Sequence, residues 1–337
     1  MAQKKSFEEL LKAICLNPLS EGFVMAKPVQ QDSGKQEAVI RWLEEKSQLI
    51  ITRKRDGWKT YNINAGGEIK IYTDKPRDIT DCLPHLNKEL GSLRLPPKTF
   101  LVSEGLMMVG NKDDRGKVPG VLNASKEKTV ENQKKFGPMS LMVFDIAFWG
   151  GEYLLNKPYS HRLGLIQKIL RKTKCQHISS PEVLDMSFAE AQKVVAKQDW
   201  EGLVLYDTNF TSSFRLDGKD PERPTGCYKW KPIKEDDFIA YDWKISDKIA
   251  GQLKEVLIAQ IDPETKTLFD CGKFGGFDTA TRERLKNMDY PFVVQLQFVA
   301  RTESGKLQEA RFVSLREDKK TDNCIAPKHF EKSTPIS

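Results

Sequence analysis

The sequence predicts an α+β fold in two parts, a domain of antiparallel sheets with flanking helices followed by a small β-barrel. The chain has 337 residues, which is too long for one ordinary hydrophobic core and suits two domains. Short strand-like segments mixed with helices over roughly the first 230 residues are typical of an α+β domain. Past Pro232 the pattern changes to five strand-like segments, with one helix between the third and the fourth.

The first part combines four helix-like segments with several strands. A capping box at residues 6–9 precedes a helical apolar face, and a second helix is expected over 37–46. Two later helices begin near Ser160 and at Ser187, where Glu190 completes another capping box. The expected strands of this part cover residues 48–53, 59–64, 68–72, 100–109, 140–148 and 202–206.

The second part follows the plan of an OB-fold, a five-stranded barrel with a helix between its third and fourth strands. We place the boundary near residues 233–237 and expect domains over 1–234 and 235–330, with a weakly ordered tail after Asp322. The expected strands cover residues 238–245, 255–261, 267–271, 292–300 and 310–315, and the expected helix covers 279–287.

The composition is that of a soluble protein with a mild basic excess. Hydrophobic residues make up 39% and charged residues 30%, and no apolar stretch approaches the length of a membrane span. The N-terminus leads into an amphipathic helix, so we expect no secretory signal and no membrane partner. The net charge of +7 permits polyanion binding without requiring it. The cysteines form no C-x-x-C pair, which argues against structural zinc and favours a reducing, cytoplasm-like compartment.

Residues 110–140 differ from the rest of the first part. They contain glycines, few large apolar residues, and seven Lys or Arg against four Asp or Glu. One interpretation is a solvated surface insertion. The other is a flexible basic loop that contacts a phosphate backbone.

Three lysines are candidates for nucleotide chemistry. Lys54 ends an apolar strand and begins the sequence K-R-D-G. An amine must be unprotonated to attack phosphorus, and neighbouring cations favour that form. Lys229 and Lys231 are spaced i, i+2, so on a strand they share one face and can hold a phosphate. Taken alone, they also fit an ordinary amphipathic strand.

Carboxylates at strand ends are candidates for binding a divalent cation. Magnesium prefers hard oxygen ligands, and phosphoryl transfer requires such a cation to offset phosphate charge. Glu201 precedes an apolar strand, and Asp56 and Glu104 lie at other strand ends. Phe144, after another apolar run, fits either a stacking position against a purine or the core.

The ordered set of these segments resembles the covalent nucleotidyltransferase superfamily of ATP-dependent polynucleotide ligases and mRNA capping enzymes. Within it, the chain is most similar to small DNA ligases of the phage, viral and bacterial type. Glu201-Gly202 has the ligase form, and residues 272–278 resemble a glycine-rich segment of the ligase OB domain. The matching motifs are Lys54-Arg55-Asp56-Gly57, Glu104, Phe144-Asp145, Glu201-Gly202, Lys229-x-Lys231 and Arg316-x-Asp318-Lys319.

The resemblance implies a reaction and a role for each site residue. Lys54 would attack the α-phosphate of ATP and carry AMP, which passes to the 5′-phosphate of a DNA nick before the 3′-hydroxyl seals the strand. The cofactors would be ATP and Mg²⁺ (or Mn²⁺), and the partner nicked duplex DNA, bound by a monomer in a DNA-containing compartment. The implied roles are assistance and metal binding by Asp56, nucleotide contact by Lys59, ribose binding by Glu104, adenine stacking by Phe144, metal binding by Glu201, α-phosphate contact by Lys229 and Lys231, and pyrophosphate orientation by Arg316, Asp318 and Lys319.

The chain departs from the ligase pattern at four positions. Glu104 follows Val102-Ser103, where the pattern usually has Asp-Gly. Lys59 stands where the pattern has an arginine, which replaces a planar fork by a point charge. Asp74 stands where a second arginine is usual, and Ser314 where many ligases have another. An RNA ligase or a capping guanylyltransferase of the same superfamily is the alternative enzyme, and a non-catalytic nucleic-acid-binding protein is the alternative of another class.

Overall fold

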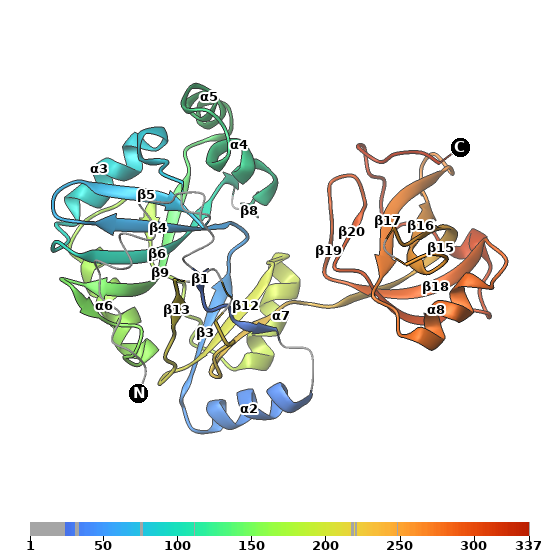
Figure 1. Ribbon diagram of the computed structural model, residues 1–337, viewed down its shortest axis with the longest axis horizontal. Coiled ribbons are helices and arrows are strands. Elements are labelled where there is room, and N and C mark those ends of the chain that lie inside the picture. The colour runs from blue at the N-terminus through green and yellow to red at the C-terminus, as the bar shows by residue number, and fades with distance from the viewer. Residues whose placement is uncertain are drawn as a thin grey trace. The chain divides into compact units, whose positions relative to one another are not determined.

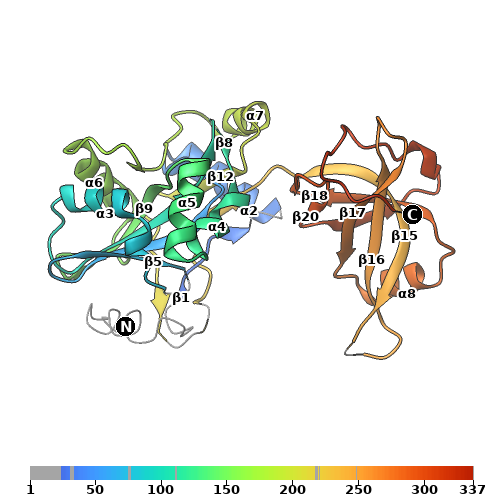
Figure 2. The same ribbon diagram turned by 90° about the horizontal axis from the view of Figure 1, so that it is seen from above.

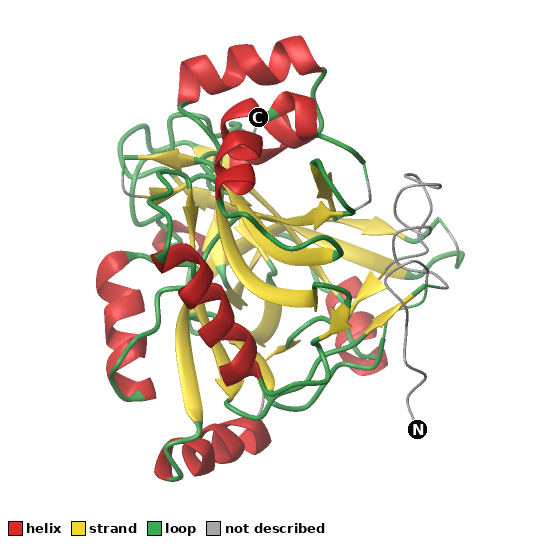
Figure 3. Ribbon diagram, turned by 90° about the vertical axis from the view of Figure 1, so that its left-hand side faces the viewer, coloured by secondary structure: helices red, strands yellow, loops and turns green. Residues whose placement is uncertain are grey.

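The computed structural model describes residues 24–30, 34–74, 77–110, 112–216, 219, 221–247 and 249–336. The capping box expected at residues 6–9 lies outside these described residues. The chain divides into two compact units, Met1–Lys231 and Pro232–Ser337. Figure 3 shows helices lying around the strands of the first unit.

Two sheets form the first unit in the described part of the chain. The larger has the order β10-β9-β6-β4-β5, with β11 beside β9, and the smaller has the order β2-β14-β12-β3. Strands of the larger sheet are β4 (Trp58–Asn64), β5 (Ile69–Thr73), β6 (Thr99–Leu106), β9 (Ser140–Trp149), β10 (Glu152–Tyr153) and β11 (Ile178–Ser179). Those of the smaller are β2 (Val29–Gln30), β3 (Leu49–Lys54), β12 (Gly202–Asp207) and β14 (Cys227–Trp230), and the short pairs are β1 (Val24–Met25) with β13 (Phe214–Arg215) and β7 (Met108–Val109) with β8 (Lys112–Asp113).

Helices cover both sheets because their apolar stripes bury against strand faces. Helices α2 (Gly34–Glu45) and α7 (Phe188–Gln198) share a core cluster with β3 and β12, and Figure 1 shows α2 beside β3. Helix α6 (Tyr159–Arg171) contacts β9, and its Tyr159 stacks on Tyr206 of β12. The capping box of Ser187 and Glu190 is present at the start of α7.

The alternation of side chains along β4 and β6 gives the larger sheet two buried faces. Leu101 belongs to a cluster with α3 (Pro84–Ser92), whereas Phe100, Val102 and Tyr61 belong to a cluster on the other face. Because the side chains on both faces are buried, this sheet is a rigid support for the residues that it carries.

Of the two interpretations of residues 110–140, the flexible loop is wrong. This segment contains α4 (Val118–Leu122) and α5 (Lys126–Phe136), which pack against each other (Figure 2). Val118, Val121 and Leu122 join the core cluster of the larger sheet. The buried Thr129 hydroxyl donates to the carbonyl of Val121, which ties the two helices together. The insertion is therefore a folded part of the first unit.

The second unit contains a five-stranded sheet in the order β17-β16-β15-β18-β21. The expected tail disorder is wrong, because Cys324 and Phe330 are buried and residues 325 and 335 form bridges to the sheet. The described elements of the second unit are β15 (Lys234–Ile245), β16 (Leu253–Ile261), β17 (Leu268–Gly275), α8 (Thr279–Lys286), β18 (Phe292–Phe298), β19 (Ala300–Arg301), β20 (Leu307–Gln308), β21 (Arg311–Leu315) and the 3-10 turn η3 (Thr321–Asn323). The first unit contains two further 3-10 turns, η1 (Thr80–Cys82) and η2 (Arg115–Lys117).

Candidate active site

Antiparallel pairing in the smaller sheet brings Lys54, Glu201 and Lys231 together. Lys54 ends β3 and lies opposite Gly202, the first residue of β12. The Lys54 Nζ lies 2.6 Å from Glu201 Oε2, and the Lys231 Nζ lies 3.4 Å from Glu201 Oε1. All three side chains are mostly buried, so one carboxylate pairs with two ammonium groups in a place of restricted solvent access. Lys229 lies two residues before Lys231 on the same chain segment, opposite Val204 and half-buried.

Two glycines in the motifs are required by close backbone approach. Gly202 has φ +152°, and a Cβ there would lie 2.1 Å from the carbonyl oxygen of Trp230. A Cβ on Gly57 would lie 2.4 Å from the carbonyl oxygen of Gly105. Any side chain at either position would push apart the strands that carry Glu201 and Glu104.

Two further carboxylates share the surroundings of Lys54. Burial and the nearby Glu201 charge raise the pKa of Asp56, and Arg115 and Lys54 oppose this rise. The Arg115 guanidinium lies 3.4 Å from Asp56 Oδ1. Burial raises the pKa of Glu104 to about 7, although Lys54 and Lys59 lower it. Asp56, Glu104 and Glu201 therefore influence one another around the same lysine.

The raised pKa of Glu104 predicts a measurable dependence of stability on pH. Between its ordinary value of 4.5 and its folded value of about 7, the folded protein binds more protons than the unfolded chain. Stability therefore decreases as pH rises through this window. We expect Glu104→Gln to raise the urea midpoint at pH 8 more than at pH 5. The exposed Glu68→Gln is the control, and an equal effect of Glu104→Gln at both pH values would contradict the assignment.

Lys59 is engaged by the unusual Asp74. The Lys59 Nζ lies 3.4 Å from Asp74 Oδ1, and the Tyr61 hydroxyl donates to the same oxygen at 2.7 Å. Lys59 also lies directly opposite Glu104 in the pairing of β4 with β6. Asp74, at the position of one arginine of the ligase pattern, thus binds Lys59, at the position of the other arginine. Lys59 and Asp74 carry opposite charges and pair, whereas two arginines at these positions would carry like charges.

Phe144 lies on β9 and is half-buried against the cluster that contains Phe100 and Phe148. Its neighbour Asp145 is buried and forms an ion pair with Arg162 of α6, with 2.7 Å between Oδ1 and Nε. The position of Phe144 is compatible with either interpretation of its aromatic ring. The Asp145–Arg162 pair, by contrast, has a clear role in fixing α6 against the sheet.

In the second unit, Arg316 and Lys319 share one buried carboxylate. The Arg316 Nη1 lies 3.1 Å from Asp237 Oδ1, and the Lys319 ammonium bonds to Oδ2 of the same residue. Arg316 also pairs with Asp318 at 2.9 Å. Sequence reasoning grouped Arg316, Asp318 and Lys319 and did not connect them with Asp237, which lies 79 residues before Arg316.

Sequence reasoning also missed Asp113 and Arg115, which reach the nucleophile segment from the insertion. Asp113 binds Arg55, and Arg115 binds Asp56. Their only signal in the sequence was the high charge of residues 110–140, which did not indicate where each charge would lie.

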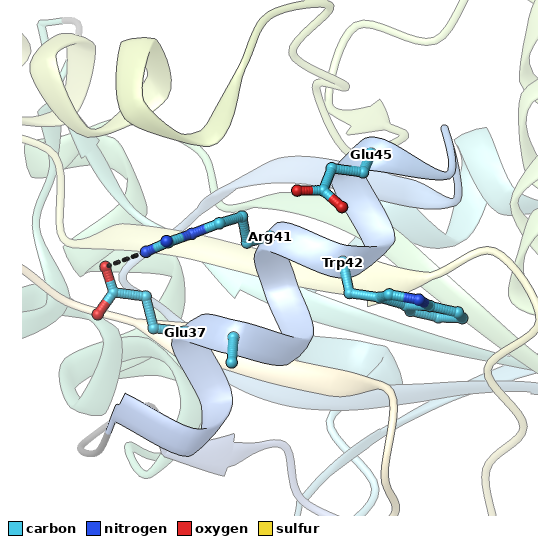
Figure 4. A pocket seen from close by; sticks show the side chains of 5 residues that line it. Glu37, Arg41, Trp42 and Glu45 are labelled. Atoms are coloured by element: carbon cyan, nitrogen blue, oxygen red, sulfur yellow. Dashed lines mark ion pairs between the residues drawn. The ribbon is translucent and has the colours of Figure 1, made fainter.

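A separate hollow lies on the outer face of α2 (Figure 4). It is lined by Glu37, Ala38, Arg41, Trp42 and Glu45, and Glu37 pairs with Arg41 at 3.7 Å. None of these residues belongs to the Lys54 cluster.

Among the described residues, no helix is both long and apolar enough to cross a bilayer.

Comparison with known proteins gives the class to which this fold and site belong. The model of the ATP dependent DNA ligase domain matches residues 28–219, which is more than half of the chain. The chain therefore belongs to the ATP-dependent DNA ligase family, and its resemblance to these enzymes is confirmed.

The relatives are distant in sequence and longer than this chain. The chain is 25% identical over 268 residues to the DNA ligase of Methanopyrus kandleri, covering 77% of this chain and 45% of that protein. It is 24% identical over 331 residues to the DNA ligase of Thermococcus fumicolans, covering 88% and 57%. The chain thus spans about half the length of the curated relatives it matches.

Solved structures confirm the expected fold class, a nucleotidyltransferase domain followed by an OB-fold. One, from a structure–function analysis of Lig E DNA ligases, has a TM-score of 0.60 at 16% identity and covers 87% of this chain and 100% of the other. Another, called Pmar-Lig_Pre, has a TM-score of 0.64 at 17% identity and covers 88% and 68%. At these identities the likeness is one of fold.

Proposed function

We propose that the protein is an ATP-dependent DNA ligase that seals 3′-OH/5′-phosphate nicks in duplex DNA through a covalent lysyl-AMP. The observation that carries this proposal is the convergence of Lys54, Lys231 and Glu201 at one end of the smaller sheet. We take residues 1–234 as the adenylyltransferase domain and 235–330 as the OB-fold domain. Membership of the ATP-dependent DNA ligase family supports both the nucleotide and the nucleic acid chosen here.

In the proposed first step, the Lys54 amine attacks the α-phosphorus of ATP and pyrophosphate leaves. The Lys54 ammonium donates to Glu201 Oε2 at 2.6 Å. Its proton would pass to solvent before the attack, and the free amine would then form the bond to phosphorus. Lys229 and Lys231 would then bind the α-phosphate oxygens and offset the charge that develops on them. Arg316, Asp318 and Lys319 would orient the pyrophosphate.

The carboxylates of the site fit the divalent cation that the family implies. Asp56 and Glu201 are hard oxygen donors, and the Glu201 charge contributes to the raised pKa of Asp56. Mutual repulsion of this kind is relieved by a cation, and Mg²⁺ needs only one or two carboxylates beside phosphate oxygens. Asp56 and Glu201 would hold the Mg²⁺ (or Mn²⁺), which would supply positive charge to the phosphates.

In the later steps, AMP passes from Lys54 to the 5′-phosphate of the nick, and the 3′-hydroxyl then displaces AMP. Glu104 would hold the ribose through both steps, and Phe144 would stack on adenine. Lys59 would contact the nucleotide or the nick phosphate with a single-point charge, and its pairing with Asp74 would weaken that contact. We further propose that the protein acts as a monomer on DNA.

The test is sealing of a nicked duplex with ATP and Mg²⁺, together with transfer of label from α-labelled ATP to the protein. We expect a labelled adduct and a sealed strand. Preferential transfer of GMP from GTP would instead indicate a capping guanylyltransferase. Sealing of nicks with RNA on both sides, but not of DNA nicks, would indicate an RNA ligase.

A further inference from the structure

We propose that Asp113, on the insertion strand β8, is a positioning residue that fixes the Lys54 nucleophile for attack. The inference rests on the proposed function and adds a residue that lies outside all the motifs of the nucleotide site. Asp113 acts through Arg53, Arg55 and the backbone of Asp56, and it does not itself touch Lys54 in the contacts described below.

The Asp113 carboxylate contacts Arg53, Arg55 and the backbone of Asp56, on both sides of Lys54 in the sequence. Its Oδ1 lies 2.5 Å from the Arg55 Nη2, and its Oδ2 accepts from the Arg55 Nε at 2.9 Å. Oδ2 also lies 3.5 Å from the Arg53 Nη2. The backbone N–H of Asp56 donates to Oδ2 at 3.2 Å. The carboxylate is 7% exposed, so these contacts are only weakly screened by solvent.

Two arginines that flank Lys54 meet the same carboxylate. Side chains alternate along β3, so Arg53 leaves the strand on the side opposite to Lys54, and Arg55, the first residue past the strand, binds the same Asp113. Asp113 clamps that opposite side. A small rotation of the backbone at residue 54 would break the Arg53 and Arg55 contacts together, and these contacts therefore restrain the direction of the Lys54 side chain.

The segment after Lys54 depends on this clamp because the sheet does not hold it. The pairing of β3 with β12 ends at Lys54 and Gly202, and β4 begins at Trp58. The N–H of Asp56 thus falls outside both strands, and Asp113 is its acceptor. Asp56, the proposed metal ligand, is placed by the same carboxylate that restrains the nucleophile.

The clamp extends toward Glu201 through Arg53. The Arg53 guanidinium lies 4.6 Å from the ring centre of Trp200, the residue directly before Glu201. Among the described residues the Arg53 Nε is buried without a hydrogen-bond partner, while the guanidinium contacts Asp113 and the Trp200 ring. One carboxylate therefore links the two chain segments that form the Lys54–Glu201 pair.

The test compares Asp113→Asn with a matched control one residue away. Asp114 pairs with Lys117 inside the insertion, so Asp114→Asn removes a carboxylate without touching the nucleophile segment. For each full-length variant, we would measure the rate of lysyl-AMP formation at saturating ATP, the KM for ATP, the sealing of a pre-adenylylated nick, and the urea midpoint.

We expect Asp113→Asn to slow lysyl-AMP formation by about 10- to 100-fold, because misplacement of a reacting group by about 1 Å has effects of this size. Sealing of a pre-adenylylated nick should fall clearly less than lysyl-AMP formation, because it does not need attack by Lys54 and depends on Asp113 only through the placement of Asp56. Asp113→Glu, which keeps the charge, should recover part of the rate. Asp114→Asn should match the wild type.

Two results would overturn the inference. One is a wild-type rate of lysyl-AMP formation in Asp113→Asn, and the other is an equal loss in all steps together with a lowered urea midpoint, which would indicate a purely structural ion pair. If Asp113→Asn does not fold, Arg55→Met breaks the same link and must give the same split between steps. Absence of the adduct in the wild type would instead defeat the proposed function, and so the two failures are distinguishable.

Discussion

Replacement of Lys54 by alanine is expected to abolish transfer of AMP to the protein, to below about a thousandth of the wild-type rate. No other amine can substitute, because covalent catalysis requires the nucleophile at the reacting phosphorus. The fold should survive, since Glu201 keeps its second partner Lys231 at 3.4 Å. The measurement is the appearance of label from α-labelled ATP on the protein, with mass spectrometry to locate it.

The same variant separates the steps of the proposed reaction. Lys54→Ala should still seal a nick that already carries AMP on its 5′-phosphate, because the 3′-hydroxyl is then the nucleophile. The control is Lys70→Ala, which removes a lysine paired with Glu68 on the protein surface. Retention of the labelled adduct in Lys54→Ala, or AMP found on another residue, would refute the assignment of the nucleophile.

Removal of the Asp145 carboxylate is expected to destabilise the first unit by about 3–5 kcal/mol, the usual cost of leaving a buried charge unpaired. Arg162 has no exposed side-chain surface and pairs with Asp145 through two nitrogens, at 2.7 and 3.2 Å. Its remaining nitrogen donates to the carbonyl of Phe210 at 3.2 Å. Asp145→Ala would leave this guanidinium buried with carbonyl partners alone, and the urea midpoint is the measurement.

An exposed pair provides the matched control for this prediction. Glu152 and Lys157 lie 3.5 Å apart at the surface, so Glu152→Ala should change stability by about 0–1 kcal/mol. The double variant Asp145→Leu with Arg162→Met should recover much of the loss, because it removes both charges. A midpoint of Asp145→Ala equal to that of the wild type would mean that the motif aspartate does not serve the fold.

The central arrangement of the site was predictable because strands reveal themselves in sequence. The strands expected over residues 48–53 and 202–206 correspond to β3 and β12, and their antiparallel register places Lys54 opposite Gly202, next to Glu201. The boundaries of β4 and β9 also fall within a residue or two of expectation. A short run of apolar and β-branched residues is a local signal, and it survives tertiary packing.

The helices that sequence reasoning missed carry weaker local signals. Helix α5 buries only Thr129 among its residues, so it shows no apolar stripe. Helix α3 does have Pro84 at its start and the pair Leu86 and Leu90, a signal that was available and was not used. The partners Asp113 and Asp237 were not predictable, since a single acidic residue becomes a counter-ion only through contacts far along the chain.

The pairing of Asp237 with both Arg316 and Lys319 affects how strongly the Arg316-x-Asp318-Lys319 motif can attract an anion. Both cations are already paired with the Asp237 carboxylate inside the second unit. A phosphate that binds Arg316 and Lys319 must replace the Asp237 carboxylate, so the net gain in electrostatic energy is small. Binding of pyrophosphate would therefore be weak and readily reversed. In the proposed reaction, the Asp237 carboxylate would therefore compete with pyrophosphate for these two cations and favour its release.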